Sequence, residues 1–260
     1  MAVLKKRVDF GRYSSIKIGP VLDVVLIDKI EKIPDEFYIV GGANNLLVSN
    51  NPPPLAMLSK RFDYIEIKNG KLHIGAATKG GRVVSFAKKH NIANFEFMQK
   101  IPGTIGGMIK MNAGLKNEEI FNHLTAVKTH KGYIKKEDIL HGYRYAYIEE
   151  AVFEAVFEIQ EGFSQNKIEI FKKIRKNQPS DPSAGSCFKN PPSDYAGRLI
   201  EEVGLRGYRI NDAAFSFKHA NFLINLKNAS FGDAIELIKE AKRRVYDKFR
   251  IILENEVKIL

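Results

Sequence analysis

Cysteine is almost absent from the sequence, and the single one, Cys187, excludes any intramolecular disulfide. One thiol also excludes a zinc site built from several thiolates, and the six histidines never occur at a metal-ligand spacing such as His-Glu-x-x-His, so we expect no metal. No apolar run approaches the roughly 20 residues of a membrane helix, and the opening residues lack the hydrophobic block of a secretory signal. These absences predict a cytoplasmic protein without membrane insertion.

The composition is that of a globular protein with an excess of positive charge. Hydrophobic residues make up 44% and charged residues 27% of the 260 positions, enough for a substantial core in one large or two smaller domains. The net charge of +11 predicts an anionic partner such as a nucleic acid, a membrane surface or a phosphorylated small molecule. A general enrichment of lysine in the proteins of the source organism explains the charge equally well. Charge alone does not choose among these alternatives.

The first half of the chain is strand-rich around one clear hairpin. Residues 64–78 contain two alternating segments joined by Asn69 and Gly70, a pair that suits a type I′ turn because both positions need positive φ. Residues 80–91 follow with their apolar side chains on one helical stripe. Residues 151–160 alternate as a further strand. The pattern predicts strands that flank a helix.

A change in composition near residue 161 predicts a domain boundary, followed by a short amphipathic helix and a loop with two prolines. A longer helix is predicted from Ser230, because Asp233 three residues later completes a capping-box pattern before an apolar stripe that continues to Phe249. Residues 251–260 alternate as a strand. Its predicted apolar face consists of Ile251, Leu253, Val257 and Ile259.

Two glycine-rich segments have the composition of backbone cradles for phosphate. In residues 41–49, glycines let amide groups turn toward a ligand, and asparagines tolerate left-handed backbone conformations. Residues 101–114 repeat this composition with four further glycines. Neither segment is a P-loop or a GxGxxG fingerprint. Taken singly, each segment is more readily interpreted as a set of tight turns than as a cofactor cradle. The presence of both segments in one chain brings the support for the two interpretations closer together.

Seven segments, in order, resemble the motif series of a flavoenzyme family, the UDP-N-acetylenolpyruvoylglucosamine reductases of bacterial cell-wall synthesis. They are GGANNLLVS, IPGTIGGMIKMNAG, GYRY, AGSCFKNP, AGRLIEEVGLRGYRI, KHANFLIN and LENEV. The resemblance covers about residues 14–260, and the lack of an inserted module between residues 145 and 180 resembles the smaller subtype. Two departures occur: residues 43–45 read Ala-Asn-Asn where the family usually has Gly-Ser-Asn, and residues 115–117 replace a common Ala-Tyr-Gly.

The resemblance implies an α+β protein with a vanillyl-alcohol-oxidase-like FAD-binding fold. Residues 1–160 would form an FAD-binding domain of two subdomains split near 55–65, residues 161–248 a smaller α/β substrate-binding domain, and residues 249–260 a strand that returns toward the flavin site. The FAD would be non-covalent, with its pyrophosphate held by backbone amides of the glycine segments. The implied FAD-binding residues are Gly42, Ala43, Asn44, Asn45, Leu46, Pro102, Gly103, Thr104, Gly106, Gly107, Asn112, Ala113 and Gly114.

The implied reaction is the reduction of UDP-N-acetylglucosamine enolpyruvate to UDP-N-acetylmuramate, a step of peptidoglycan synthesis and hence of cell shape and division. A hydride passes from NADPH through FAD to the substrate double bond. Negative charge then builds on the neighbouring carbon and into the carboxylate. The site must therefore stabilise an enolate-like state and deliver a proton.

Ser186 aligns with the serine acid of this family. A strand through this segment would point Ser186 and Phe188 to one face and Cys187 to the other, which makes Cys187 a small packed side chain. From the residues alone, a turn serine bonded to nearby backbone is the favoured interpretation of Ser186. The resemblance implies instead that Ser186 donates the proton.

Two charged residues align with the remaining catalytic positions of the family. Arg144 aligns with the arginine that grips the substrate carboxylate and the developing enolate, a role that suits its planar fork of donors. Its alternative is a surface ion pair with Glu149 or Glu150. Periodicity does not choose between Glu254 and Glu256. The family pattern of glutamate before valine selects Glu256 as the residue that orients or protonates the intermediate, with Glu254 as the fallback.

Lys189 and Asn190, which follow the serine, are implied to contact the diphosphate or sugar of the substrate. Other motif residues are implied to line the substrate domain, although each is as readily structural: Tyr208, Lys218, His219 and Asn221. The positive charge would then serve the phosphates of NADPH and of the UDP-sugar. We expect a monomer that binds no nucleic acid. One alternative is an FAD-dependent sugar or lactone oxidase of the same fold, which would use oxygen and need no serine acid. The other, a basic nucleic-acid-binding protein, is supported only by net charge.

Overall fold

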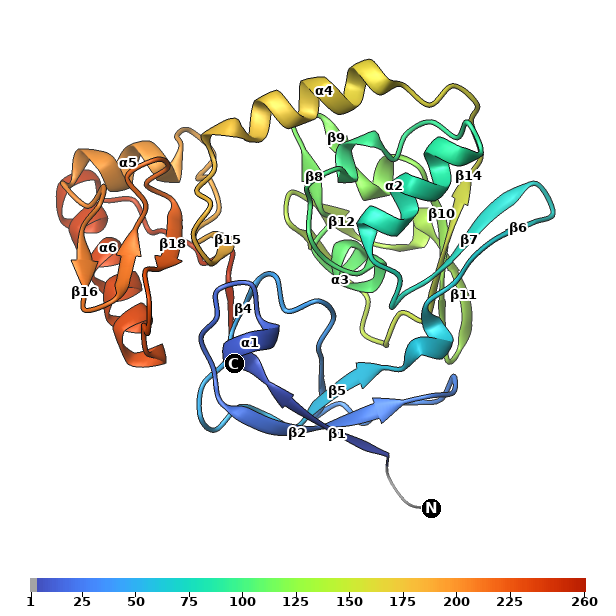
Figure 1. Ribbon diagram of the computed structural model, residues 1–260, viewed down its shortest axis with the longest axis horizontal. Helices are drawn as coiled ribbons and strands as arrows, with labels where there is room; N and C mark the ends of the chain where they lie inside the picture. Colours follow the sequence, from blue (N-terminus) through green and yellow to red (C-terminus); the bar gives the residue numbers. More distant parts are fainter. Residues whose placement is uncertain (1–3) are drawn as a thin grey trace. The chain divides into compact units, whose positions relative to one another are not determined.

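The chain is described for residues 4–260 in a computed structural model, whose helices and strands are labelled in Figure 1. It divides into two compact units. Unit 1 contains residues 24–42 and 54–176 together with the described residues up to Lys6, and unit 2 contains residues 7–23, 43–53 and 177–260. Residues 1–3 of the predicted first domain lie outside the described residues.

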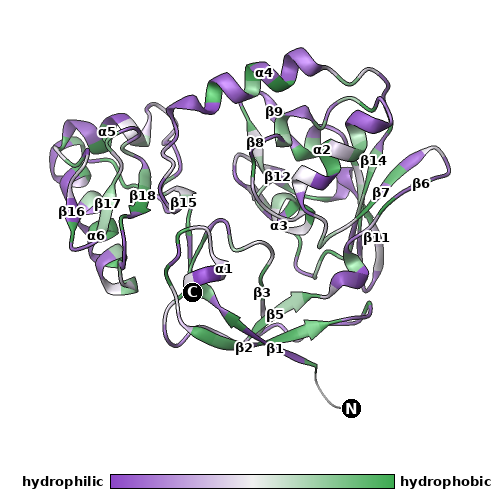
Figure 2. Cartoon of the chain, viewed as in Figure 1, coloured by the Kyte–Doolittle hydropathy of each residue, from purple (hydrophilic) through white to green (hydrophobic). Residues whose placement is uncertain are grey.

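This division differs from the predicted boundary at residue 161. Helix α4 (Gln165–Ile174) belongs to unit 1, because its Ile168 and Phe171 are buried in the core of that unit. Hydrophilic and hydrophobic stretches alternate along α4, as expected for a helix that buries one face (Figure 2). The first 160 residues do not form one continuous unit either, since two of their segments belong to unit 2.

Unit 1 is built on two groups of strands. In the first group, β2 (Val21–Ile27), β5 (Leu55–Leu58) and β3 (Tyr38–Ile39) pair in parallel, with β1 (Lys5–Asp9) next to β2. Residues 7–9 of β1 and 21–23 of β2 are assigned to unit 2. The second group is an antiparallel sheet in the order β11 (Gly132–Lys135), β10 (Leu124–Thr129), β14 (Glu154–Glu158), β7 (Lys71–Gly75) and β6 (Ile65–Lys68).

The predicted hairpin is confirmed in this sheet. Strands β6 and β7 are joined by Asn69 at φ 51° and Gly70 at φ 71°, the two positive φ values that a type I′ turn requires. The predicted helix after it is α2 (Gly80–Lys89), which buries Val83, Val84 and Ala87. Strand β14 confirms the predicted strand over part of its length.

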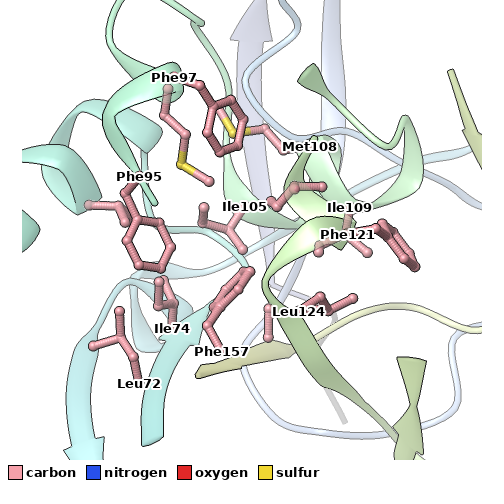
Figure 3. Packing of buried hydrophobic residues seen from close by; sticks show 14 of the residues in the cluster. Leu72, Ile74, Phe95, Phe97, Ile105, Met108, Ile109, Phe121, Leu124 and Phe157 are labelled. Carbon is pink, nitrogen blue, oxygen red and sulfur yellow. The ribbon is translucent and has the colours of Figure 1, made fainter. Parts of the chain in front are cut away.

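The core of unit 1 lies between the antiparallel sheet and its helices (Figure 3). Ile105, Met108 and Ile109 of helix α3 (Ile105–Lys110) are buried there. They gather with Phe121, Leu124 and Phe157 in Figure 3. Full burial of an aliphatic side chain contributes about 1.5–3 kcal/mol. Helix α3 is therefore firmly held, and with it the glycine-rich segment that contains it.

The smaller elements of unit 1 are the 3-10 helices Lys60–Phe62, Glu96–Met98, Ile120–Asn122 and Lys136–Asp138 and the strands β8 (Gly114–Leu115), β9 (Glu118–Glu119), β12 (His141–Gly142) and β13 (Tyr145–Ala146).

Unit 2 contains an antiparallel sheet and two main helices. The sheet runs β15 (Ser183–Ser186), β18 (Phe222–Asn225), β17 (Ala213–Phe215) and β16 (Arg209–Ile210). The helices are α5 (Ala196–Glu202) and α6 (Phe231–Phe249). The remaining elements are α1 (Phe10–Tyr13), the short 3-10 helix Arg175–Asn177 at the unit boundary, β4 (Leu46–Leu47) and β19 (Lys258–Ile259).

The predicted start of the long helix is confirmed. The hydroxyl of Ser230 accepts a hydrogen bond from the amide of Asp233 at 3.1 Å, and the Asp233 carboxylate accepts one from the amide of Ser230 at 2.8 Å. This capping box satisfies two donors that the first turn of a helix leaves without partners.

The predicted strand over residues 251–260 is wrong in its extent. Only β19 is a strand, because its partner β4 is two residues long and pairs with it in parallel. Leu253 and Val257 are buried as predicted, but Ile259 is 37% exposed. The apolar face is therefore shorter than the alternation suggests.

Candidate active site

In unit 1, the glycines bring backbone segments closer than side chains would permit. A Cβ on Gly41 would lie 2.5 Å from Oγ1 of Thr104, and one on Gly106 would lie 3.1 Å from Cβ of Ala76. The first glycine segment therefore packs against the start of α3, where the hydroxyl of Thr104 caps the helix by accepting a hydrogen bond from Gly107. The two glycine-rich segments need glycine at these positions, because a side chain there would prevent such close backbone packing.

Several amides of these segments are available to a ligand. Among residues 4–260, no group accepts a hydrogen bond from the backbone amides of Ala43, Asn44, Gly103 or Thr104. Ala43 has φ 49° and Gly103 φ 142°, conformations that turn successive amides out of the regular pattern. Donors of this kind suit a diphosphate, and their contact with the pyrophosphate of FAD stays a prediction. Within these segments Gly42 and residues 102–114 belong to unit 1, and residues 43–46 to unit 2.

Arg144 lies in the two-residue turn of the hairpin formed by β12 and β13. Its backbone is left-handed, with φ 63°, which is uncommon for a residue other than glycine. The guanidinium donates a hydrogen bond to the carbonyl of Gly114 at 3.3 Å and lies 5.0 Å from the centre of the Tyr143 ring. Of the two carboxylates considered as surface partners, that of Glu150 pairs with Lys131 and that of Glu149 accepts a hydrogen bond from Tyr147. Arg144 therefore lies beside the last residue of the second glycine segment.

In unit 2, Ser186 ends strand β15 and has a hydroxyl that is not used by the fold. It is half-buried and pairs with Phe222 of β18. Among residues 4–260, its Oγ has no hydrogen-bond partner. Ser183 on the same strand behaves as a turn serine instead, since its hydroxyl accepts a hydrogen bond from Gly185 at 3.1 Å. The Ser186 hydroxyl can therefore donate a proton to a ligand without breaking a bond of the fold.

The predicted strand through Phe188 is shorter in the structure, because β15 ends at Ser186. Cys187 is 1% exposed and Phe188 0%, so both lie in the core of unit 2. Beyond the end of the strand, the Asn221 side chain bonds both backbone groups of Phe188, accepting from its amide at 2.9 Å and donating to its carbonyl at 2.8 Å. Cys187 is a packed side chain as predicted, and burial raises the pKa of its thiol far above the usual range.

The carboxyl-terminal segment lies against the residues that follow Ser186. The amide of Glu256 donates to the carbonyl of Cys187 at 2.9 Å, and the amide of Lys189 donates to the carbonyl of Glu254 at 2.9 Å. The segment also meets the first glycine segment, since Asn45 donates from its side chain to the carbonyl of Glu256 at 2.9 Å. Unit 2 therefore brings Ser186, Glu256 and Asn45 into one neighbourhood.

The two terminal glutamates differ in their surroundings. Glu254 is an exposed partner of Lys189, at 3.2 Å, whereas Glu256 is half-buried next to the segment of Ser186. This difference favours Glu256 over Glu254, which periodicity did not separate.

The predicted substrate residues have varied surroundings in unit 2. The side chain of Asn190 accepts a hydrogen bond from the amide of Ala196 at 3.1 Å, and that of Asn221 holds Phe188, so both of these side chains support the fold. The ring of Tyr208 lies under the guanidinium of Arg244 at 4.8 Å. Lys218 is exposed. Contact of these residues with a substrate stays a prediction.

The pH dependence of protein stability tests the surroundings of His219. Its ring lies over Gly197, where an added Cβ would be 3.2 Å from Cε1, and its Nδ1 accepts a hydrogen bond from the amide of Asn221 at 3.3 Å. Burial, followed by the nearby charge of Arg206, lowers the pKa of His219 below its ordinary value of 6.5. Below that value the unfolded chain binds a proton that the folded protein resists, so stability is lost as the pH falls.

We therefore expect His219→Gln to weaken the loss of stability between about pH 7 and pH 5. Urea unfolding at a series of pH values measures this. The matched control is His90→Gln, at an exposed position. Parallel profiles for the parent and His219→Gln would contradict the assignment.

Gly114 has no room for a side chain, and its substitution tests the second glycine segment. A Cβ there would lie 2.4 Å from the carbonyl oxygen of Glu118 and 2.8 Å from Cγ of Glu119, in the pair of β8 and β9. We expect Gly114→Ala to lower the free energy of unfolding by about 1–3 kcal/mol and to weaken flavin retention. Thermal melts and flavin absorbance after gel filtration measure both effects. Gly81→Ala on α2, where nothing lies within 4 Å, is the control and should be neutral or slightly stabilising; equal behaviour of the two variants would refute the steric argument.

Two further findings concern other classes of site. No helix between residues 4 and 260 is both long and apolar enough to cross a bilayer. Across the same residues, histidine, cysteine, aspartate and glutamate side chains form no group of three or more that could hold a metal ion.

Comparison with known proteins gives consistent matches over nearly the whole chain. Residues 178–260 match the model of the UDP-N-acetylenolpyruvoylglucosamine reductase C-terminal domain. The UDP-N-acetylenolpyruvoylglucosamine reductases of Campylobacter jejuni (strain RM1221) and Helicobacter hepaticus are 46% and 48% identical to this chain, each over 97% of it, and the alignments cover 99% and 98% of those proteins.

A solved structure agrees with these matches. The UDP-N-acetylenolpyruvylglucosamine reductase of Thermus caldophilus superimposes with a TM-score of 0.86 at 29% identity, over 99% of both chains. Together with the identity and coverage of the curated relatives, this shows that the chain belongs to the UDP-N-acetylenolpyruvoylglucosamine reductase family.

Proposed function

We propose that the protein reduces UDP-N-acetylglucosamine enolpyruvate to UDP-N-acetylmuramate with NADPH, in peptidoglycan synthesis. Family membership supports the reaction, and one observation supports its chemistry here. The Ser186 hydroxyl has no partner among residues 4–260 and lies in the segment to which Glu256 is hydrogen-bonded through its backbone. A hydroxyl that no group of the fold uses is a suitable proton donor to a developing carbanion.

In this proposal, three residues of the chain have different chemical roles. Ser186 donates a proton to the carbon that bears the carboxylate, and the Glu256 carboxylate orients that hydroxyl or returns its proton. Arg144 presents its planar fork to the substrate carboxylate, where negative charge accumulates. Each positions or moves a proton or stabilises charge. None needs to form a covalent bond to the substrate.

The cofactor in the proposal is a non-covalent FAD, in a fold of the vanillyl-alcohol-oxidase type. Bound by the amides of the two glycine segments, FAD would carry the hydride from NADPH to the substrate double bond. The remaining implied FAD contacts, the substrate contacts of residues such as Lys189 and Lys218, a monomeric state and a cytoplasmic location belong to the same proposal.

Product analysis tests this function. The purified protein is incubated with FAD, NADPH and the UDP-enolpyruvyl sugar, and the products are separated and identified by mass. We expect one UDP-sugar heavier by two hydrogens for each NADPH consumed, and NADPH consumption that stops when the sugar is omitted. Turnover of an alcohol with peroxide formation and no use of the sugar would instead identify an oxidase of the same fold. Tight, salt-sensitive RNA binding without flavin absorbance would favour the nucleic-acid alternative.

A further inference from the structure

Lys110 is a charged residue whose side chain is partly buried. It ends helix α3, directly after Met108 and Ile109, which are buried in the core of unit 1. Its ammonium donates hydrogen bonds to the carbonyl of Ile148 and, at 3.0 Å, to the carbonyl of Glu150. Burial lowers the pKa of Lys110, an effect that the nearby Glu150 only partly offsets. A partly buried ammonium is costly unless its donors are used, and here two of them are.

The two carbonyls belong to the segment that continues the hairpin of Arg144. Strands β12 and β13 pair His141 with Ala146 and Gly142 with Tyr145, and the amide of Tyr147 extends the ladder by donating to the carbonyl of Leu140 at 2.8 Å. The ladder therefore runs from the Arg144 turn to within one residue of Ile148. A displacement of Ile148 would move the stem of the hairpin.

Two more bonds link the same elements at regular intervals. The side chain of Asn112 donates to the carbonyl of Gly142 at 3.0 Å, and Arg144 donates to the carbonyl of Gly114 at 3.3 Å. Residues 110, 112 and 114 of the second glycine segment therefore each bond the hairpin or its continuation. Asn112 is itself fixed, since it also donates to Glu119 at 2.7 Å and accepts from the amide of Phe121 at 3.4 Å.

The hairpin needs such support because its turn is intrinsically unfavourable. Arg144 occupies the left-handed region at φ 63° without being glycine or asparagine. Residues held in such conformations persist when their surroundings determine them. Of the three bonded residues, Lys110 is the one that the resemblance does not imply as an FAD contact, and its bonds reach the continuation of the hairpin at residues 148 and 150.

We propose that Lys110 is a positioning residue that joins the Arg144 hairpin to the flavin-binding segment. Binding of FAD to this segment then also fixes the orientation of the Arg144 guanidinium. The inference rests on the proposed function for the identity of FAD and of the carboxylate that Arg144 meets. It assigns to Lys110 no contact with substrate or cofactor. Its effect is transmitted through the carbonyls of residues 148 and 150.

The kinetic test separates the two half-reactions by anaerobic stopped-flow absorbance. In Lys110→Met, NADPH should bleach the flavin at the parent rate, while reoxidation by the enolpyruvyl sugar slows by about 10- to 100-fold, because a small misplacement of Arg144 affects only that half. Lys110→Arg keeps the charge and the donors and should restore reoxidation to within about threefold of the parent. Lys88→Met, which removes an exposed lysine from α2, is the control and should match the parent. Parent-like reoxidation in Lys110→Met, or equal slowing of both halves, overturns the proposal.

A second measurement needs no turnover. Hydrogen exchange of the parent is followed with and without added FAD, at the amides of residues 140–147. We expect FAD to protect the Tyr147 amide along with the amides of residues 103–114, and we expect this protection of the hairpin to be lost in Lys110→Met. Protection confined to the glycine segment, with the hairpin unchanged, overturns the proposal even if Lys110→Met retains too little flavin for kinetics. A parent that binds FAD and protects the hairpin but does not turn over the sugar would contradict the proposed function and leave this coupling standing.

Discussion

Ser186→Ala is expected to remove the second half of the reaction and spare the first. NADPH should still bleach the flavin at the parent rate, because the Ser186 hydroxyl has no part in that hydride transfer. Reoxidation by the enolpyruvyl sugar should slow by about 100- to 10,000-fold, the usual range for loss of a positioned general acid. Anaerobic stopped-flow absorbance measures both rates on one sample. The fold should be unaffected, since no group among residues 4–260 is bonded to the Ser186 hydroxyl.

The matched control removes a hydroxyl from the same strand. Ser183 is three residues away, and its hydroxyl serves the backbone of Gly185. Ser183→Ala should therefore lower the free energy of unfolding by about 1 kcal/mol without separating the two half-reactions. If Ser186→Ala slows both halves equally, Ser186 acts in folding or in shared binding rather than as the acid.

Arg144→Lys is expected to have the second-largest effect. Lysine keeps the charge and tolerates the left-handed turn about as well as arginine, but it cannot present a planar fork to a carboxylate. We expect kcat/KM for the enolpyruvyl sugar to fall by about 100- to 1,000-fold, with flavin bleaching by NADPH unchanged. Steady-state kinetics over a range of sugar concentrations, with stopped-flow for the first half, measure this.

A conservative exchange elsewhere in unit 1 provides the comparison. Arg82 is exposed and pairs with Asp63 at 2.5 Å, so Arg82→Lys should change neither half-reaction. Arg144→Lys activity within about threefold of the parent would show that positive charge alone suffices at this position, against the argument from fork geometry.

Local chemistry explains which parts of the fold the sequence predicts well. The hairpin turn depends on Asn69 and Gly70, and the start of α6 depends on Ser230 and Asp233, so each is decided within a few residues. The terminal strand depends on a distant partner. Its predicted length fails because β4, about two hundred residues earlier in the chain, is only two residues long.

The same distinction holds for the site. The glycine segments, Ser186 and Arg144 could be named from motifs. The backbone bonds between Cys187 and Glu256 place the last segment beside that of Ser186, while its return toward a flavin site stays a prediction. The end of β15 at Ser186 could not be predicted, because the backbone of the following Phe188 is bonded by the side chain of Asn221, 33 residues away. Lys110 gave no signal either, since nothing in its local sequence indicates carbonyl partners at positions 148 and 150.

The most direct test of the account is the fate of reducing equivalents in the parent protein. The flavin is bleached anaerobically with one equivalent of NADPH, and the UDP-enolpyruvyl sugar is then mixed in without oxygen. We predict full return of the flavin absorbance within the turnover time, with one equivalent of UDP-N-acetylmuramate formed. A flavin that stays bleached until oxygen is admitted would contradict the account, because the sugar would then not be its electron acceptor.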